Sequence, residues 1–574
     1  MYEKIRKRDG RLVNFSKDRK AKAIFKAARE VGGQDYTTSE NIADDVVSFM
    51  IRERGPEIVP EVEYVQDCVE KVLIEKGHAR TAKTYILYRD KRTRFRETKS
   101  ELMDIVNDIL IETSRENANI GNSPSAKMLQ IASAASKQYY LSKVVPTKMA
   151  DAHIKGDIHI HDLDYYGKTL NCLQIDLEKL LLKGFNTGYG YIRPPKRITS
   201  ASAQAAIILQ SNQNDMFGGQ SFPHFDRAMA RVMRQLPTKP DYDEVFQSME
   251  ALVYNLNSMH SRAGAQVPFS SINLGTDTSE EGRMVIRAML EAFQKGLGKG
   301  ESPIFPNLVF RVKKGVNFNV GDPNYDLFQL AIKVAARRMN PTFSFMDSSF
   351  NKEYGDEVSY MGCRTRTIGN RHGLEISAGR GNIAPVTINL PRLALKAKGD
   401  TEVFFKELQQ ILDLCTEQLV HRFETIGALL VKDLPFLMGQ QLYMGSENLK
   451  EDDCIREAIK NGTLGIGFIG LAEALIALTG KHHGESEEAQ QLGLKIVGFM
   501  REHCDKMCEM HDLNFVCYAT PAEGTCGRFI PMDAELFGVI PGVTDKEFYT
   551  NSYHVPVDYN IGMFDKIKIE GQYH

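Results

Sequence analysis

A cysteine on a short turn is the strongest candidate for chemistry in this sequence. Cys363 follows Gly362 in the segment 360–366 (YMGCRTR), where two arginines place positive charge near the thiol. A reactive sulfur would be placed on such a turn. The alternative is that Cys363, one of nine cysteines, is a small buried hydrophobic residue. Composition alone favours that alternative.

Two features downstream point to the same pocket as this thiol. Residues 379–382 (GRGN) predict a tight turn that ends at Asn382. Residues 386–392 (VTINLPR) are a β-branched run closed by proline, which predicts a strand. A thiol, an amide and the end of a strand therefore converge on one candidate pocket.

A second candidate is a loop that could cradle phosphate. Residues 520–529 (TPAEGTCGRF) follow the strand-like run 515–519 and combine hydroxyl groups, an arginine and glycines that leave backbone N–H groups accessible. An ordinary loop with a capping threonine explains this segment equally well. The candidate phosphate contacts are Thr520, Ala522, Glu523, Gly524 and Thr525.

No metal site is expected. Cys504, Cys508 and His511 share a helical face and could hold zinc, but a half-buried helix stripe is the favoured interpretation. His159 and His161 alternate along a predicted strand, and two histidines without a third ligand are more often structural or substrate-contacting.

The first thirty residues carry eleven Lys or Arg against four Asp or Glu, which predicts a local site for an anion. Basic residues alternate on both sides of Asp9-Gly10, a strong hairpin signal. Ser16 is a predicted N-cap, and helical spacing follows it and recurs near 38–54, 61–77 and 79–95. Residues 1–95 are thus predicted to form a small helical module with a cationic hairpin; a solvated charged surface is the alternative.

The elements that must position the candidate residues are long helices alternating with short strands from about residue 100 onward, which predicts an α/β domain, with a barrel as one form. The predicted strands are 158–160, 269–274, 308–311, 343–346, 386–390, 464–469, 515–519 and 551–557. The pattern GIGFIG at 465–470 resembles a dinucleotide motif, but a polar loop occupies the place of the expected acidic strand. We therefore interpret these glycines as a strand-to-helix packing corner.

Composition sets broader limits. The 574 residues exceed one ordinary core, so a large catalytic domain and a smaller module are expected. A net charge of −2 does not favour binding of nucleic acid or a membrane by the protein as a whole. With no run of 18 apolar residues and sparse cysteines, we expect a cytoplasmic protein without a disulfide framework.

Taken together, these segments resemble the large subunit of anaerobic, class III ribonucleoside-triphosphate reductases. The N-terminal hairpin and helices resemble an ATP-cone regulatory module, with Lys20 departing from its pattern. The barrel motifs that carry the resemblance occur in the family's order, at 158–164, 171–174, 217–220, 361–365, 379–382, 387–392 and 551–557.

The resemblance implies a ten-stranded β/α barrel over residues 100–574 and an ATP-cone over 1–95. Cys363 would become a thiyl radical that abstracts the ribose 3′ hydrogen, with Cys172 and Asn382 on either side of the substrate. Formate would be the reductant, Cys172 would act in removal of the 2′ hydroxyl as water, and Asn382 would position the reacting groups. ATP and dATP would be effectors. The implied effector contacts are Lys7, Arg8, Asp9, Gly10 and Arg19.

The implied partners are ribonucleoside triphosphates, a radical-SAM iron–sulfur activating enzyme and a second copy in a homodimer. The sequence departs from the family after residues 565–570: no four-cysteine zinc site and no Arg-x-x-Gly-Tyr radical segment follows. Zinc is therefore not expected, and a second polypeptide would supply the glycyl radical. The alternatives are a shortened form of an ordinary reductase and a catalytically inactive, nucleotide-binding regulatory remnant.

Overall fold

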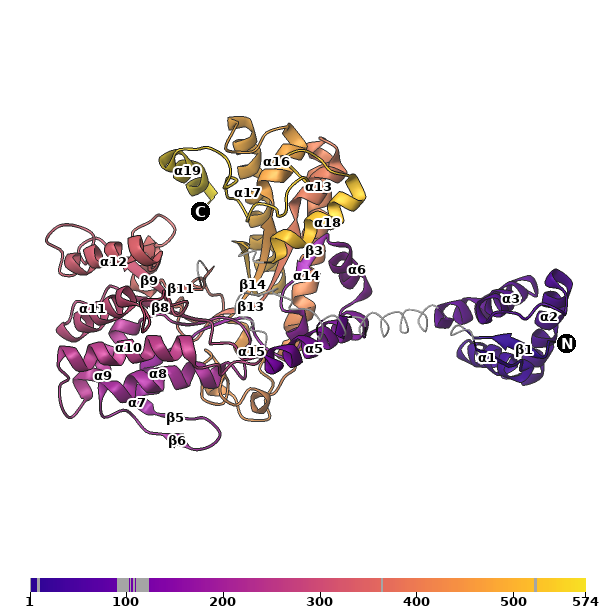
Figure 1. Ribbon diagram of the computed structural model, residues 1–574, viewed down its shortest axis with the longest axis horizontal. Helices are drawn as coiled ribbons and strands as arrows, with labels where there is room; N and C mark the ends of the chain where they lie inside the picture. The colour runs from indigo at the N-terminus through magenta and orange to yellow at the C-terminus, as the bar shows by residue number, and fades with distance from the viewer. Residues whose placement is uncertain are drawn as a thin grey trace. The chain divides into compact units, whose positions relative to one another are not determined.

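The computed structural model describes residues 2–7, 11–89, 103, 105, 106, 109, 123–362, 365–520 and 524–573. The chain divides into two compact units, Met1–Asp108 and Ile109–His574 (Figure 1). Each unit has its own hydrophobic core. No helix among the residues described is long and apolar enough to cross a membrane.

The N-terminal unit is a small hairpin with helices. Its elements are β1 (Lys4–Arg6), β2 (Leu12–Asn14), α1 (Lys17–Glu30), α2 (Tyr36–Arg54), α3 (Val62–Glu75) and a helical segment over 79–89. The two strands pair antiparallel, as predicted. Ser16 caps α1 by accepting a hydrogen bond from the Arg19 N–H, which confirms the predicted N-cap.

The second unit begins its α/β architecture with a parallel sheet. Its strand order is β10-β9-β8-β7-β4, and all four neighbouring pairs are parallel. The strands are β4 (Leu173–Gln174), β7 (Gln220–Phe222), β8 (Ser270–Leu274), β9 (Asn307–Val312) and β10 (Thr342–Phe345). Successive parallel strands need crossover connections, and helices supply them here. Figure 1 shows α8 to α12 gathered beside this sheet.

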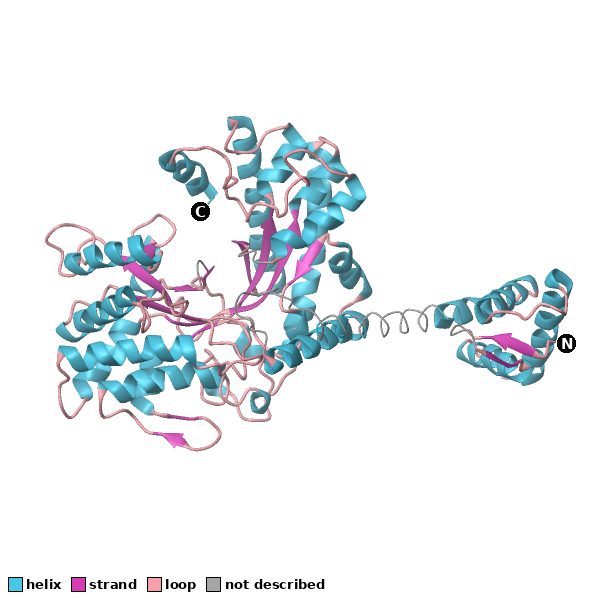
Figure 2. Ribbon diagram, in the orientation of Figure 1, coloured by secondary structure: helices cyan, strands magenta, loops and turns pink. Residues whose placement is uncertain are grey.

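A second sheet has the order β15-β14-β13-β3, with β3 antiparallel to β13 and the other pairs parallel. Its strands are β3 (Ile158–Ile160), β13 (Asn382–Asn389), β14 (Thr463–Ile469) and β15 (Asn514–Ala519). Every residue of β13 and β14 is buried, as expected for strands covered on both faces. Figure 2 shows these strands surrounded by helices.

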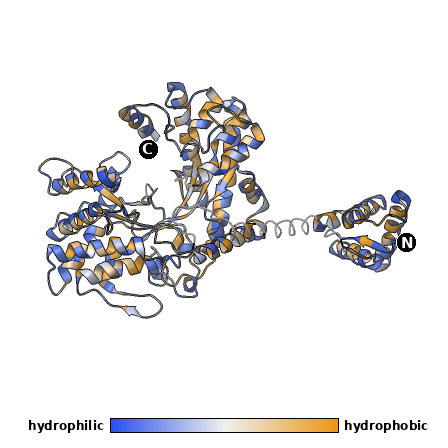
Figure 3. Ribbon diagram, viewed as in Figure 1, coloured by the Kyte–Doolittle hydropathy of each residue, from blue (hydrophilic) through white to orange (hydrophobic). Residues whose placement is uncertain are grey.

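Figure 3 shows that the helices carry both polar and apolar residues, as expected of amphipathic surface helices. The remaining elements cover the two sheets or connect their strands. They are α5 (Pro124–Tyr139), α6 (Thr147–Lys155), α7 (Leu177–Lys183), β5 (Phe185–Asn186), β6 (Tyr191–Ile192), α8 (Ile198–Asn212), α9 (Phe225–Gln235), α10 (Tyr242–Ser258), α11 (Glu280–Lys295), α12 (Tyr325–Arg338), β11 (Tyr360–Met361), β12 (Thr365–Arg366), α13 (Leu390–Ala397), α14 (Thr401–Gly427), α15 (Arg456–Ile459), α16 (Leu471–Thr479), α17 (Glu487–His511), α18 (Thr525–Phe537) and α19 (Met563–Glu570).

The two sheets meet at a seam between the start of β4 and the start of β13. The N–H of Cys172 donates to the carbonyl of Asn382 (3.1 Å), and the N–H of Gln174 donates to the carbonyl of Arg380 (2.8 Å). The seam joins the five-stranded and the four-stranded sheet, nine strands in all, as the two halves of a barrel. No pairing between β10 and β15 is found in the described part of the chain, so closure at that side is not observed. The predicted α/β architecture is confirmed.

One predicted strand is wrong. Residues 551–557 form turns, with Ser552 at a φ of 44°. Their backbone groups serve the start of α16 instead, because the N–H of Gly470 donates to the carbonyl of Thr550 and that of Leu471 donates to the carbonyl of Ser552.

The GIGFIG segment is a packing corner, as expected. Gly465 and Gly467 lie inside β14, and Gly470 turns the chain into α16 at a φ of 76°, with the Pro391 ring against it. A side chain on Gly470 would clash with that ring.

Candidate active site

Cys172 and Asn382 lie against each other at the seam. Besides the bond from the Cys172 N–H, the N–H of Asn382 donates to the Cys172 sulfur at 3.2 Å. Both side chains are buried. Burial raises the pKa of the Cys172 thiol to about 12, so the group is neutral near pH 7. A neutral, buried thiol can give up a proton or a hydrogen atom but is a poor nucleophile.

The carboxamide of Asn382 has one satisfied end and one free end. Its Nδ2 donates to the hydroxyl of Thr463 at 3.1 Å, and its Oδ1 is buried without a hydrogen-bond partner. Buried polar atoms rarely stay unpaired in a folded protein. The free oxygen is therefore available to a hydroxyl group of a bound ligand.

Two glycines of β14 make room for the neighbouring strand's side chains. A Cβ at Gly465 would lie 2.9 Å from the Tyr518 ring and 3.2 Å from the Asn382 Nδ2. A Cβ at Gly467 would lie 2.1 Å from the Thr520 hydroxyl. The glycines thus let Tyr518 and Thr520 pack flat against β14, in a row that begins at Asn382. Burial raises the pKa of Tyr518, which keeps the phenol neutral.

Thr520 ends this row and begins the candidate phosphate loop. Its hydroxyl lies 2.8 Å from that of Thr387, which in turn lies 2.7 Å from the Nε2 of His161. Ala522 and Glu523 lie outside the described residues. Gly524 is the N-cap residue of α18 and Thr525 its first residue, and no side chain among the described residues caps this 13-residue helix. Its N-terminal N–H groups can therefore receive an anion.

Arg528 does not point to a ligand. Its guanidinium donates to the carbonyls of His153 (2.5 Å) and Ile158 (3.3 Å), so it fastens α18 to α6 and β3. Arg528, which contributed to the phosphate-loop prediction, therefore has a structural role. The N-terminus of α18 remains as the candidate anion-binding feature.

Three histidines lie in sequence beside Thr387 and Thr520, beginning from His161. The rings of His153, His159 and His161 follow one another at centroid distances of 5.3 and 4.7 Å. Burial lowers the pKa of His153 to about 3 and that of His161 to about 4, and it lowers the pKa of His159 well below its usual value. All three rings are therefore neutral near pH 7, and the Nδ1 of His159 is buried without a hydrogen-bond partner.

Cys363 and Arg364 lie outside the described residues, but the strands of their hairpin are described. β11 and β12 pair antiparallel, with Met361 opposite Thr365. β11 runs along β7 and β8, where the N–H of Gly362 donates to the Ser271 hydroxyl at 2.8 Å. The hairpin that carries Cys363 is therefore held against the first sheet.

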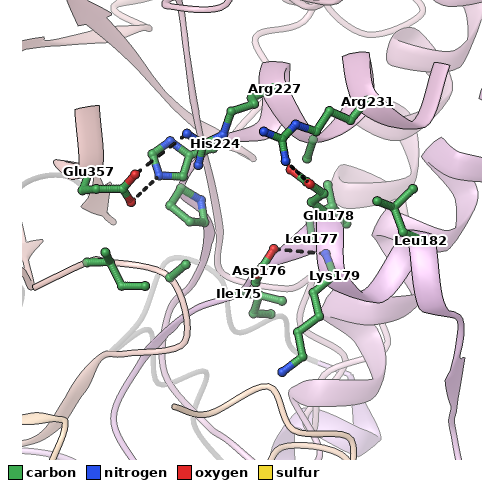
Figure 4. A pocket seen from close by; sticks show the side chains of 14 residues that line it. Ile175, Asp176, Leu177, Glu178, Lys179, Leu182, His224, Arg227, Arg231 and Glu357 are labelled. Atoms are coloured by element: carbon green, nitrogen blue, oxygen red, sulfur yellow. Dashed lines mark hydrogen bonds and ion pairs between the residues drawn. The ribbon is translucent and has the colours of Figure 1, made fainter. Parts of the chain in front are cut away.

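A pocket of about 350 Å³ borders the base of this hairpin, at the carboxyl ends of β4 and β7 (Figure 4). Glu357 lines it and lies 3.4 Å from His224, while Arg231 pairs with Glu178. Arg311 donates to the other ring nitrogen of His224 at 2.8 Å. Cys172 and Asn382 are not among the residues that line this pocket, so it is distinct from the seam.

The cysteines and histidine of α17 do not converge. Cys504 is buried, His511 is exposed, and Cys508 accepts a hydrogen bond from the Phe515 N–H at 3.2 Å. Within the described ranges, no group of three or more histidine, cysteine or acidic side chains is arranged to hold a metal ion.

The implied effector contacts are only partly described. The N–H of Lys7 donates to the carbonyl of Arg11, which closes the hairpin, and Arg19 is exposed in the first turn of α1. Arg8, Asp9 and Gly10 lie outside the described residues.

The structure thus brings Cys172 against Asn382, at the start of the row that ends at Thr520. Sequence reasoning missed Tyr518 and Thr387, and it valued Gly465 and Gly467 only for packing. A signal was present: Tyr518 and Thr520 are two residues apart at the end of a strand, as are the two glycines, and a period of two puts each pair on one face.

Comparison with known proteins agrees with this architecture. An anaerobic ribonucleotide reductase from Thermotoga maritima, solved with dATP and CTP, matches with a TM-score of 0.64 at 18% identity, over 84% of each chain. A B12-independent glycerol dehydratase from Clostridium butyricum matches with a TM-score of 0.52 at 10% identity, over 78% of this chain and 73% of that chain. The fold is therefore the barrel type of anaerobic ribonucleotide reductases and this dehydratase, as predicted.

Sequence comparison identifies the family. The family model described as anaerobic ribonucleoside-triphosphate reductase matches residues 116–574, and that of the ATP cone domain matches 3–94. The anaerobic ribonucleoside-triphosphate reductases of Salmonella typhimurium and Escherichia coli are each 34% identical, over all of this chain and 84% of theirs. This chain belongs to the anaerobic ribonucleoside-triphosphate reductase family, and the predicted resemblance is confirmed.

Proposed function

We propose that this enzyme reduces ribonucleoside triphosphates to 2′-deoxyribonucleoside triphosphates without oxygen, through a thiyl radical on Cys363. The observation that carries the proposal is the hydrogen-bonded pair of Cys172 and Asn382 at the seam of a reductase-type barrel. A neutral thiol against the backbone of an asparagine whose amide oxygen is free suits a step in which a hydroxyl group leaves as water. The cytoplasm is the proposed location.

The reaction balances with formate as the reductant. A ribonucleotide, formate and one proton give the deoxyribonucleotide, carbon dioxide and water. Cys172 would provide the proton for the departing 2′ hydroxyl, and the Oδ1 of Asn382 would accept a hydrogen bond from a ribose hydroxyl. A glycyl radical on a further segment or a partner chain would supply the oxidising equivalent for Cys363, after activation by a radical-SAM iron–sulfur enzyme.

The triphosphate would lie at the start of α18. Thr520, Gly524 and Thr525 would contact it with hydroxyl and N–H groups, together with Ala522 and Glu523. The hydroxyl of Thr520 already bonds to Thr387, so a phosphate there would join an existing network rather than order a free side chain.

We also propose that residues 1–95 are the regulatory domain, which binds ATP or dATP through Lys7, Arg8, Asp9, Gly10 and Arg19, and that residues 100–574 form the catalytic barrel. Two copies of the chain would assemble as a homodimer.

The test is anaerobic turnover of the chain with a polypeptide that carries the glycyl-radical segment and with the activating enzyme. We expect CTP to yield dCTP with one carbon dioxide released per product from labelled formate. Cys363→Ala should abolish turnover while CTP still binds in equilibrium dialysis. If dCTP forms at an unchanged rate without formate, or with Cys363→Ala, the proposal is wrong.

A further inference from the structure

Polar side chains form an unusual row on one face of the first sheet. The strand register places Gln174 of β4 beside Ser221 of β7, and Ser221 beside Ser271 of β8. Asn273 lies two residues further along β8, on the same face. All four are fully buried. Buried polar groups are costly unless they are hydrogen-bonded, so the partners of this row show what it does.

The partners lie in one short segment, residues 359–362, immediately before Cys363. Asn273 accepts from the N–H of Tyr360 at 2.8 Å and donates to its carbonyl at 2.7 Å. Its carboxamide thus takes both backbone groups of Tyr360, as a neighbouring strand would. Ser221 also donates to the Tyr360 carbonyl (3.0 Å), and Ser271 accepts from the Gly362 N–H (2.8 Å).

Gln174 holds the same segment one step earlier and also belongs to the seam. Its Nε2 donates to the carbonyl of Ser359 at 3.3 Å, and its Oε1 accepts from the Ser359 hydroxyl at 2.6 Å. Its own backbone donates to the Arg380 carbonyl and accepts from the Gly379 N–H. One buried residue therefore links three segments, which carry Cys172, Asn382 and Cys363.

We propose that Gln174 and Asn273 are positioning residues that fix the cysteine hairpin relative to the Cys172–Asn382 seam. Neither touches a reacting atom in this scheme. They act through the backbone of Ser359 and Tyr360, so that strand β11 keeps one position against β7 and β8. The inference rests on the proposed function for its catalytic meaning, but the placement of the hairpin can be measured without turnover.

The test uses the intact chain with Gln174→Met and Asn273→Leu, which keep side-chain volume and remove the hydrogen bonds. Asn257→Leu is the matched control. Its carboxamide likewise accepts from the N–H groups of Ile304 and Phe305 and donates to the Phe305 carbonyl, but that loop carries none of the three proposed catalytic residues. Peptide-resolved alkylation would give the labelling rate of Cys363, with the exposed Cys454 as internal reference.

We expect Cys363 to be labelled at least threefold faster in Gln174→Met and Asn273→Leu than in the parent, and within twofold of the parent in Asn257→Leu. In the complemented reaction, kcat should fall at least tenfold in the first two variants while the KM for CTP changes less than threefold. If the larger substitutions prevent folding, Ser271→Ala replaces them, because it removes only the hydrogen bond to the Gly362 N–H. It should also raise the labelling rate of Cys363. Labelling that is unchanged in these variants, or raised equally in Asn257→Leu, overturns the inference. A parent without turnover but with this labelling pattern would count against the proposed function alone.

Discussion

The backbone N–H of Asn382 donates a hydrogen bond to the sulfur of Cys172, and the N–H of Cys172 donates to the carbonyl of Asn382. These residues are 210 positions apart in the chain. The reciprocal bonds fix the thiol against the backbone of Asn382 before any ligand binds, so the two residues are preorganised. They also join the two sheets, so the geometry of the candidate site and that of the barrel depend on the same contacts.

Substitutions of Cys172 can separate the structural role of its sulfur from its proposed chemical role. Cys172→Ala leaves the Asn382 N–H buried without an acceptor and should cost about 1–3 kcal/mol of unfolding free energy. Cys172→Ser restores an acceptor and should recover most of that loss. Neither variant should support turnover, because a hydroxyl cannot replace the thiol in the proposed step. Urea denaturation and anaerobic dCTP formation measure the two properties.

The pKa of Cys172 adds a second criterion for that thiol. Because burial raises its pKa to about 12, the group stays protonated across the ordinary range of assay pH. Ionisation of Cys172 should therefore not lower the kcat of the parent enzyme between pH 7 and 9. Activity of Cys172→Ser above one tenth of the parent would show that the sulfur is not required.

Gly467 tests whether the surface of β14 bounds the proposed triphosphate site. In Gly467→Ala the new methyl group would lie 2.1 Å from the Thr520 hydroxyl and 2.9 Å from the Tyr518 ring, so both must shift. We expect the KM for CTP to rise at least tenfold. Overpacking of this kind also costs about 1–3 kcal/mol of stability.

Gly498→Ala is the matched control for that substitution. Gly498 lies within α17, and a Cβ there meets no atom within 4 Å. Alanine should stabilise the helix by about 1 kcal/mol and leave the KM unchanged. Equal KM values in Gly467→Ala and Gly498→Ala would remove Thr520 from the proposed phosphate contacts.

Lys7 and Arg19 test the proposed effector site in the N-terminal unit. Arg19 is exposed at the start of α1, and Lys7 is half-buried directly after β1, so we test both as contacts of a nucleoside triphosphate. Lys7→Ala and Arg19→Ala should each weaken ATP binding at least fivefold in isothermal titration. Lys17→Ala removes the same charge from a side chain that already pairs with Asp44 at 2.7 Å. It should change the affinity less than twofold; an equal loss in all three variants would indicate a general effect of charge.

Local signals in the sequence predicted much of this fold. The Ser16 cap, the N-terminal hairpin and the strands at 158–160, 464–469 and 515–519 follow from short-range patterns, and the structure contains them. The strand prediction for 551–557 was wrong because the segment has the hydrophobic alternation of a short strand, although it forms turns that cap a helix. Its true role depends on Gly470, which is far away in the chain.

The arrangement of the candidate site could not be predicted in the same way. The bond between Cys172 and Asn382 and the two bonds of Asn273 to Tyr360 depend on strand order and register, which no local pattern specifies. The resemblance named Cys172, Asn382 and Cys363 as a group, but it did not indicate that Gln174 connects them. Buried polar residues in strands were the available signal, because each one requires a partner.

Three histidines whose pKa values are lowered, His153, His159 and His161, predict how stability depends on pH. Each is neutral in the folded protein, with pKa values of about 3 for His153 and about 4 for His161, against 6.5 when exposed. Below pH 6.5 the unfolded chain binds protons that the folded chain does not, so the unfolding free energy falls as pH falls. For His153 alone, the loss between pH 6.5 and 5.0 is about 1.6 kcal/mol.

His153→Gln should therefore make stability less dependent on pH. Glutamine keeps an acceptor for the Ile160 N–H, which donates to the His153 Nδ1 at 3.1 Å, but it does not titrate. The drop in urea midpoint between pH 6.5 and 5.0 should be smaller in this variant than in the parent, by the equivalent of about 1.6 kcal/mol. His260→Gln changes an exposed histidine and should leave the drop unaltered. If His153→Gln loses as much stability as the parent over this range, folding does not lower the pKa of His153, and its ring does not face a dry interior.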